Sequence, residues 1–125
     1  MDYSKPIVMH EKEIPAEKVS EEMAIGTRIQ WLVGMEAPTF AMRRFTLEPR
    51  AHIKNHRHPW EHEIYVLEGS GRVAIDGKVY EVGKDTFLYI PPCSWHEYWA
   101  GDDGMVVLCM IPVKPTSNEC VREFK

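Results

Sequence analysis

Hydrophobic and polar residues alternate in short runs along most of the chain, and turn-forming residues separate the runs. Alternating runs of about 4–8 residues are typical of half-buried β-strands. Because many such runs follow one another at regular spacing, the pattern predicts an all-β sandwich or barrel in a single domain. The predicted strands are residues 27–33, 40–47, 63–67, 71–75, 78–82, 86–90, 95–99 and 105–111.

Turn residues mark how these strands are connected. Asp76 and Gly77 stand between two predicted strands and favour the tight primed turn of a hairpin. Pro91 and Pro92 end the strand before them. The Gly-Asp-Asp-Gly sequence at 101–104 separates the last two predicted strands.

The two ends of the chain differ from the middle. Residues 15–23 have a weak helical pattern, but helices shorter than about 12 residues are marginal alone. We therefore divide the chain into an N-terminal arm at 1–25 with a short helical or strand piece, a barrel at 26–112, and a polar C-terminal tail at 113–125. The tail is expected to lie on the surface or to reach a neighbouring subunit.

Composition excludes several classes of function. The formal net charge is -4, so no excess of basic residues is available to bind the phosphates of nucleic acid. The longest apolar run spans 8 residues, whereas a membrane helix needs about 20, and the N-terminus has no apolar secretion signal. The three cysteines, Cys93, Cys109 and Cys120, form no paired motif. We expect free thiols in a reducing, cytoplasmic environment.

Histidines gather just before a predicted buried strand. His56 and His58 are two positions apart, so in a strand they face the same side. His62 follows after a proline and a tryptophan, and His96 lies 34 residues further on, after the Pro-Pro turn. A lone histidine is usually a surface or hydrogen-bonded core residue, as we expect for His10 and His52. The pattern of four instead predicts a metal site, because imidazole suits divalent transition metals.

The same residues resemble a known family. Residues 50–69 resemble the first cupin motif, G-x5-H-x-H-x3,4-E-x6-G, and residues 83–100 resemble the second, G-x5-P-x-G-x2-H-x3-N. The resemblance covers residues 40–112. Arg50 stands at the opening glycine of the first motif, while Cys93 and Ala100 stand at the second glycine and the closing asparagine of the second. His62 occupies the glutamate position of the first motif, and Glu63 follows it.

The segments APTFAMRRFTLEP, HPWEHEIYVLEG and LCMIP are similar to small bacterial cupins with a four-histidine, manganese-type centre. That resemblance implies a jelly-roll β-barrel, a homodimer and one divalent metal per chain, which would be Mn, Fe, Ni, Cu or Zn, with Mn or Fe favoured. Glu63 is the competing ligand, but strand alternation turns it away from the side that His62 faces. The implied metal ligands are His56, His58, His62 and His96.

A substrate pocket is expected beside the metal. Tyr98 shares the face of His96, and the resemblance favours the Cys109 face of the last strand as inward. Arg43 either holds a substrate carboxylate at the pocket mouth or forms a surface salt bridge. Cys109 is given no catalytic role, because a buried thiol usually packs as a small hydrophobe. The predicted pocket residues are Arg43, Phe45, Tyr98, Val107, Cys109 and Ile111.

The ligand chemistry bounds the function. Replacing a glutamate with a histidine raises the charge of the centre by one unit, which favours anion binding and disfavours higher oxidation states. We predict a metal-dependent oxidoreductase or dioxygenase acting on a small oxygen-rich or enolisable molecule. The alternatives are a non-redox isomerase or decarboxylase and a non-catalytic binding module. An outward patch that includes Trp95, Trp99, Leu108 and Met110 is consistent with a homodimer.

Overall fold

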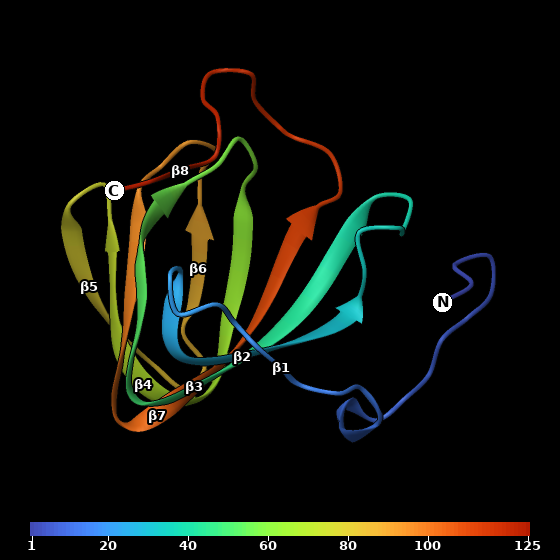
Figure 1. The fold of residues 1–125 in the computed structure, drawn as a ribbon, viewed down its shortest axis with the longest axis horizontal. Coiled ribbons are helices and arrows are strands. Elements are labelled where there is room, and N and C mark those ends of the chain that lie inside the picture. The colour runs from blue at the N-terminus through green and yellow to red at the C-terminus, as the bar shows by residue number, and fades with distance from the viewer.

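The computed structural model describes residues 1–125 and is almost entirely β-structure (Figure 1). Antiparallel strands pair in the order β1-β2-β3-β7-β4-β5, while β6 pairs with β4 and β8 pairs with β3. This confirms the predicted all-β fold. The strands are β1 (Glu17–Lys18), β2 (Ala24–Val33), β3 (Phe40–Arg57), β4 (His62–Ile75), β5 (Lys78–Gly83), β6 (Phe87–Ile90), β7 (His96–Pro112) and β8 (Glu123–Phe124).

Three long strands each replace a shorter or divided predicted strand. β3 continues through Glu48 and Pro49, β4 continues through Gly69, and β7 continues through the 101–104 sequence. The pairing register shifts at these positions, so the turn residues bend the strands without ending them. At Gly69, where φ is 78°, an added Cβ would lie 2.1 Å from the carbonyl oxygen of Gly104. Glycine is therefore required where β4 and β7 bend together.

The hairpin at Asp76 and Gly77 forms as predicted, with β4 and β5 paired from Ile75 and Lys78 outward. The weak helical pattern at 15–23 does not produce an α-helix. Glu17 instead pairs with Ile29 of β2, because an edge of the sheet satisfies the backbone better than one isolated helical turn. A short 3-10 helix, η1 (Glu11–Glu13), precedes it. None of the helical segments has the length and hydrophobicity that crossing a membrane requires.

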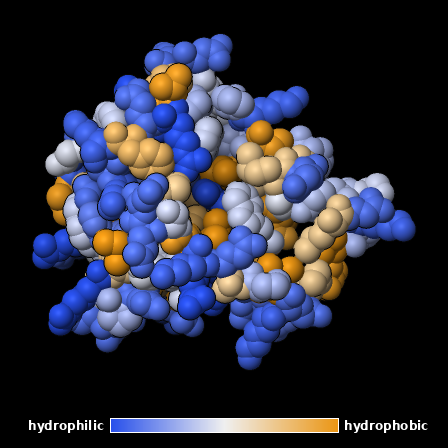
Figure 2. Space-filling model, in the orientation of Figure 1, coloured by the Kyte–Doolittle hydropathy of each residue, from blue (hydrophilic) through white to orange (hydrophobic).

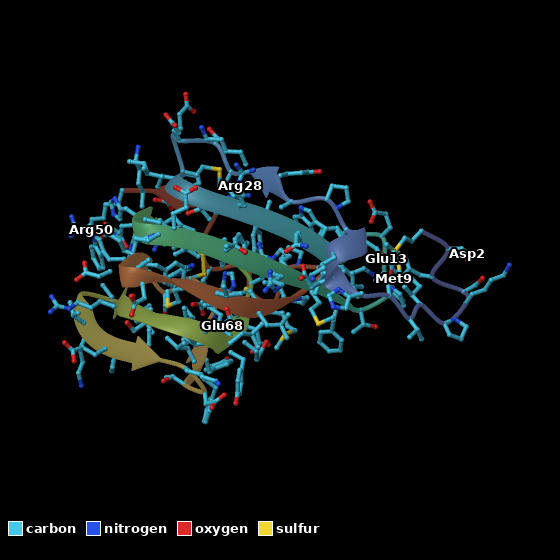
Figure 3. The ribbon with its side chains drawn as sticks, turned by 90° about the horizontal axis from the view of Figure 1, so that it is seen from below. Asp2, Met9, Glu13, Arg28, Arg50 and Glu68 are labelled. Atoms are coloured by element: carbon cyan, nitrogen blue, oxygen red, sulfur yellow. A yellow bond between two sulfur atoms is a disulfide. The ribbon has the colours of Figure 1, made fainter.

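The two ends of the chain lie in different surroundings. The N-terminal segment runs past the end of β2 in Figure 1, where the hydroxyl of Tyr3 accepts from the N–H of Gly34, and Figure 3 places Asp2 and Met9 at the end opposite Arg50. The C-terminal segment folds back onto the barrel, and its strand β8 pairs with β3 through His56 and Phe124.

A disulfide joins Cys93 to Cys120, so the expectation of three free thiols is wrong for these two residues. The two cysteines are 27 residues apart in sequence, and only the fold of the tail brings them together. Cys109 stays free and buried. The expected reducing compartment loses the support that free thiols would have given it.

The hydrophobic core lines the inside of the barrel. Inward residues alternate along β4 and β7, where Ile64, Val66, Val107 and Cys109 are buried. This inward face also surrounds a cavity of about 370 Å³. Figure 2 shows that the face of the molecule seen in Figure 1 is hollowed near its middle.

Candidate metal centre

Three histidines converge inside the barrel. His56 lies near the end of β3, His58 follows that strand, and His96 begins β7. One potential ligand atom of each lies within 4.8 Å of those of the other two. His58 and His96 are 3% and 1% exposed, and His56 and His96 are direct partners in the β3–β7 ladder. Strand pairing therefore brings together imidazoles that are distant in sequence.

The three rings share one hydrogen-bond arrangement, in which Nδ1 faces a backbone carbonyl two residues away. A carbonyl only accepts, so each ring donates its Nδ1 proton and leaves Nε2 unprotonated, with a lone pair that can bind a metal. Nε2 of His96 is buried without a hydrogen-bond partner in the protein, which fits a metal ligand. The pairs are His56 with Lys54 (2.7 Å), His58 with Trp60 (3.0 Å) and His96 with Ser94 (2.8 Å).

Burial keeps these imidazoles uncharged. Desolvation is the main cause that lowers the pKa of His58 to about 3 and that of His96 to about 4, and neighbouring histidines lower both further. Desolvation also lowers the pKa of His56, with added repulsion from Arg122 and Arg43. Neutral imidazole is the form that binds a metal ion. The three residues could therefore hold a divalent cation at neutral pH.

His62 lies beside this group but outside it. It begins β4, is 5% exposed and points inward. Its Nε2 is 2.6 Å from Nε2 of His58, while its Nδ1 is 2.9 Å from Sγ of Cys109 and 3.4 Å from a guanidinium nitrogen of Arg43. The structure thus gathers three of the four expected histidines into one cluster and places His62 against one of them.

Glu63 lies on the opposite face of β4. It is exposed and pairs with Tyr89 of β6 on the outer surface of the barrel. Partial burial, together with the hydrogen bond and charge of Glu61, raises the pKa of Glu63 to about 7. Of the two residues weighed as ligands, only His62 faces the cavity.

All six residues expected in the pocket line the cavity, and 21 of its 27 lining residues are hydrophobic. Arg43 reaches inward, where its guanidinium is 3.0 Å from Sγ of Cys109 and packs over the rings of Trp31 and Phe45. It takes part in none of the salt bridges. The hydroxyl of Tyr98 is buried without a partner. Both polar groups are available to a ligand.

Sequence reasoning missed several residues around the histidines. Trp60 stacks on His58, with ring centroids 4.2 Å apart, and Phe124 stacks on His56 at 5.7 Å. Arg122 lies over both of these aromatic rings, at 5.9 and 5.5 Å. Trp60 could have been found from its place between His58 and His62. Arg122 and Phe124 gave no such signal, because the polar tail has no periodicity.

Two departures from the cupin motifs fall at positions with a left-handed backbone. Arg50 and Cys93 stand at motif glycines, and their φ angles are 64° and 66°. This left-handed conformation explains why glycine is usual there. The N–H of Cys93 also donates to the carbonyl of His58, at 2.9 Å. That hydrogen bond ties the loop of Cys93 to the segment that carries His58.

A family model described as a cupin domain matches residues 43–112, more than half of the chain. The chain belongs to the cupin family. This cupin also resembles the solved polyketide cyclase RemF from Streptomyces resistomycificus, with 29% identity and a TM-score of 0.82. That match covers 94% of this chain and 87% of the cyclase chain. The fold is therefore the expected cupin jelly roll.

Two curated relatives match over shorter stretches. A 1-methylthio-D-xylulose 5-phosphate methylsulfurylase from Rhodospirillum rubrum is 31% identical over 74 residues, and a 5-aminosalicylate 1,2-dioxygenase from Comamonas sp. is 29% identical over 69. The matches cover 58% and 55% of this chain. They cover 47% and 18% of the two relatives, so the cupin spans less than half of their length.

Proposed function

We propose that this cupin is a metal-dependent enzyme that acts on a small, largely apolar, enolisable molecule. The observation that carries the proposal is the convergence of three neutral histidines, each with an unprotonated Nε2, beside a largely apolar cavity. A divalent ion bound there would act as a Lewis acid on a carbonyl oxygen. The proposed metal is Mn or Fe, with Ni, Cu and Zn also compatible with imidazole ligands.

His62 is the proposed fourth ligand. Its Nε2 lies beside Nε2 of His58, inside the cavity. To present a free lone pair at Nε2, His62 must donate its Nδ1 proton to Sγ of Cys109. The same sulfur accepts from Arg43. Cys109 would then orient His62 as backbone carbonyls orient the other three histidines.

The chain's own groups complete the chemistry. Burial raises the pKa of Tyr98 well above its usual range, so its hydroxyl stays protonated and can donate to a substrate oxygen. The guanidinium of Arg43 supplies positive charge close to the same cavity. Hydrophobic walls exclude water, which strengthens both interactions. Together these groups favour the enolate form of a bound carbonyl compound.

Lewis-acid chemistry is the first candidate because it needs no change of oxidation state. All proposed ligands are neutral, and no carboxylate lines the cavity to stabilise a more highly charged metal. One solved structure that matches over 94% of the chain is named a polyketide cyclase, and ring closure of an enolisable chain consumes no oxidant. Cyclisation, isomerisation and decarboxylation are the reaction types that fit.

Oxidative chemistry is the second candidate. The relative named 5-aminosalicylate 1,2-dioxygenase favours it, and the same histidines would leave metal positions open to oxygen. This was the first choice from the sequence alone. We rank it second because no carboxylate lines the cavity and a similar solved structure is named a polyketide cyclase. A homodimer with no nucleic-acid or membrane partner stays a prediction.

Metal analysis and an oxygen-controlled assay test the proposal. Protein purified without chelator should contain about one transition-metal ion per chain. It should convert a member of a panel of β-diketones and poly-β-ketones under nitrogen as well as in air. Turnover that requires oxygen would favour the dioxygenase. Ligand-induced thermal stabilisation without product would indicate a binding module, and protein that retains no added metal would overturn both enzymatic candidates.

A further inference from the structure

The cavity carries positive charge with no negative charge to balance it. Two arginines, Arg43 and Arg122, line it together with the histidines, and no aspartate or glutamate does. Neither arginine takes part in a salt bridge. A charge removed from water without a partner is costly. Such a cavity is therefore suited to a ligand that brings negative charge.

Arg43 is the inner of the two cations. Its Nε is buried without a hydrogen-bond partner. Its terminal nitrogen contacts only uncharged groups, Sγ of Cys109 at 3.0 Å and Nδ1 of His62 at 3.4 Å. The rings of Trp31 and Phe45 pack against the guanidinium, 5.5 and 5.0 Å from its central carbon. These contacts hold the guanidinium of Arg43 in place and leave N–H groups free to donate to a ligand.

Arg122 comes from the C-terminal segment and lies at the rim. It is exposed, and it is held over Trp60 and Phe124 by the strand that follows it. That strand is secured by an ion pair of Arg57 with Glu123, at 2.7 Å. Partial burial and the charge of Arg43 lower the pKa of Arg122, and both guanidiniums line the cavity.

We propose that the substrate is a carboxylate with an apolar body of one or two rings, held by Arg43 inside the cavity and drawn in by Arg122 at the rim. This substrate class rests on the proposed function, because a bound divalent metal would add to the unbalanced charge. A planar guanidinium matches a carboxylate with two parallel hydrogen bonds. A cavity of about 370 Å³ with mainly hydrophobic walls accommodates the rings.

A phosphate ester is disfavoured by the same observations. Its three terminal oxygens carry up to two negative charges and point in different directions, so the planar guanidinium of Arg43 and the hydroxyl of Tyr98 cannot satisfy all of them inside the cavity, and Arg122 lies at the rim. The donors that face the cavity are few, since 21 of the 27 lining residues are hydrophobic. A carboxylate has two oxygens, and hydrogen bonds from Arg43 and Tyr98 can satisfy both of them.

Binding of three matched probes tests the inference without any turnover. Dissociation constants for 2-naphthoate, 2-naphthamide and 2-naphthyl phosphate are measured by calorimetry on the protein as purified and after zinc loading. We expect naphthoate to bind about 10-fold to 100-fold more tightly than the amide, as is typical for a hydrogen bond to a charged group. Equal affinities, or tighter binding of the phosphate, would overturn the carboxylate class.

Arginine variants locate the contact. Arg43→Gln should abolish the preference for naphthoate over the amide, and Arg43→Lys, which keeps the charge, should restore part of it. Arg122→Gln, in the exposed C-terminal segment, should weaken naphthoate binding several-fold. Arg72→Gln is the control, since Arg72 lies on the outer surface near Glu81. A preference unchanged in both Arg43→Gln and Arg122→Gln would overturn the assignment.

The two proposals fail separately. If the protein retains no metal but Arg43 still selects naphthoate, the metal-dependent function is wrong and the ligand class stands. If the protein binds metal and turns over a neutral ketone while naphthoate and naphthamide bind equally, the ligand class alone is wrong.

Discussion

The Nε2 atoms of His58 and His62 lie 2.6 Å apart inside the barrel. Only three residues separate these histidines, and they turn the chain from the end of β3 into the start of β4. Two uncharged ring nitrogens this close share either a proton or a cation. Cys109 contacts Nδ1, the other ring nitrogen of His62. If Nδ1 donates its proton to this sulfur, Nε2 of His62 is unprotonated, and the two Nε2 atoms can share a cation instead of a proton.

His58→Ala should remove most of the bound metal while the barrel stays folded. The side chain contributes one of the three converging nitrogens, and the core of the barrel does not depend on it. Metal content per chain, measured by mass spectrometry beside a circular dichroism spectrum, checks this. His10→Ala is the matched control, since His10 is exposed and only caps η1. Full metal occupancy in His58→Ala would contradict the ligand assignment.

Cys109→Ala should weaken metal binding by about 10-fold, which is the lower end of the usual effect of losing a residue that orients a ligand. The variant leaves Nδ1 of His62 without its sulfur partner. Cys109→Ser keeps a group that accepts a hydrogen bond and should recover part of the affinity. Competition with a chelator measures the change. Wild-type affinity in the alanine variant would show that Cys109 does not position His62.

Cys120→Ser should lower the free energy of unfolding by about 3 kcal/mol, because a disulfide that closes a loop of this length restricts the unfolded chain. Urea denaturation measures the loss. A reductant should destabilise the wild-type protein by a similar amount and leave Cys120→Ser unaffected. A wild-type curve that reductant does not shift would be inconsistent with a stabilising Cys93–Cys120 bond.

Arg50→Gly should raise the free energy of unfolding by about 0.5–1 kcal/mol. Relief of the left-handed conformation, worth roughly 1–2 kcal/mol, exceeds the added flexibility of the unfolded chain. The exposed ion pair of Arg50 with Asp102 contributes little. Arg50→Ala keeps the Cβ atom and should give no gain. Equal stability of the glycine and alanine variants would remove the conformational explanation.

The fold was largely predictable because a period of two is a local property of a strand. Period two grouped Val107, Cys109 and Ile111 on one face of β7, and the cupin resemblance selected that face as inward. The turn-forming pair Asp76 and Gly77 predicted the hairpin. The lengths of the strands could not be predicted from this pattern, because Gly69 bends β4 against Gly104 without interrupting it. Whether a glycine ends a strand or bends it depends on the partner strand, which the local sequence does not contain.

The site was predictable where its residues lie in a regular strand or a known motif, as with His56, His58 and His96. The placement of His62 against Cys109 depends on packing across two strands. The contributions of Cys120 and Arg122 depend on where an irregular segment folds. A periodic pattern of hydrophobic residues predicts neither the packing between two strands nor the path of an irregular segment.

The strand β8 lies against His56, and the backbone N–H of Lys125 donates to the carbonyl of Asn55, at 3.0 Å. A purification tag fused after Lys125 would therefore emerge beside the candidate metal centre, and a polyhistidine tag there would compete for the same ions. The N-terminus lies on the opposite side of the molecule from β8 (Figure 1), so affinity handles and fluorescent fusions belong at that end.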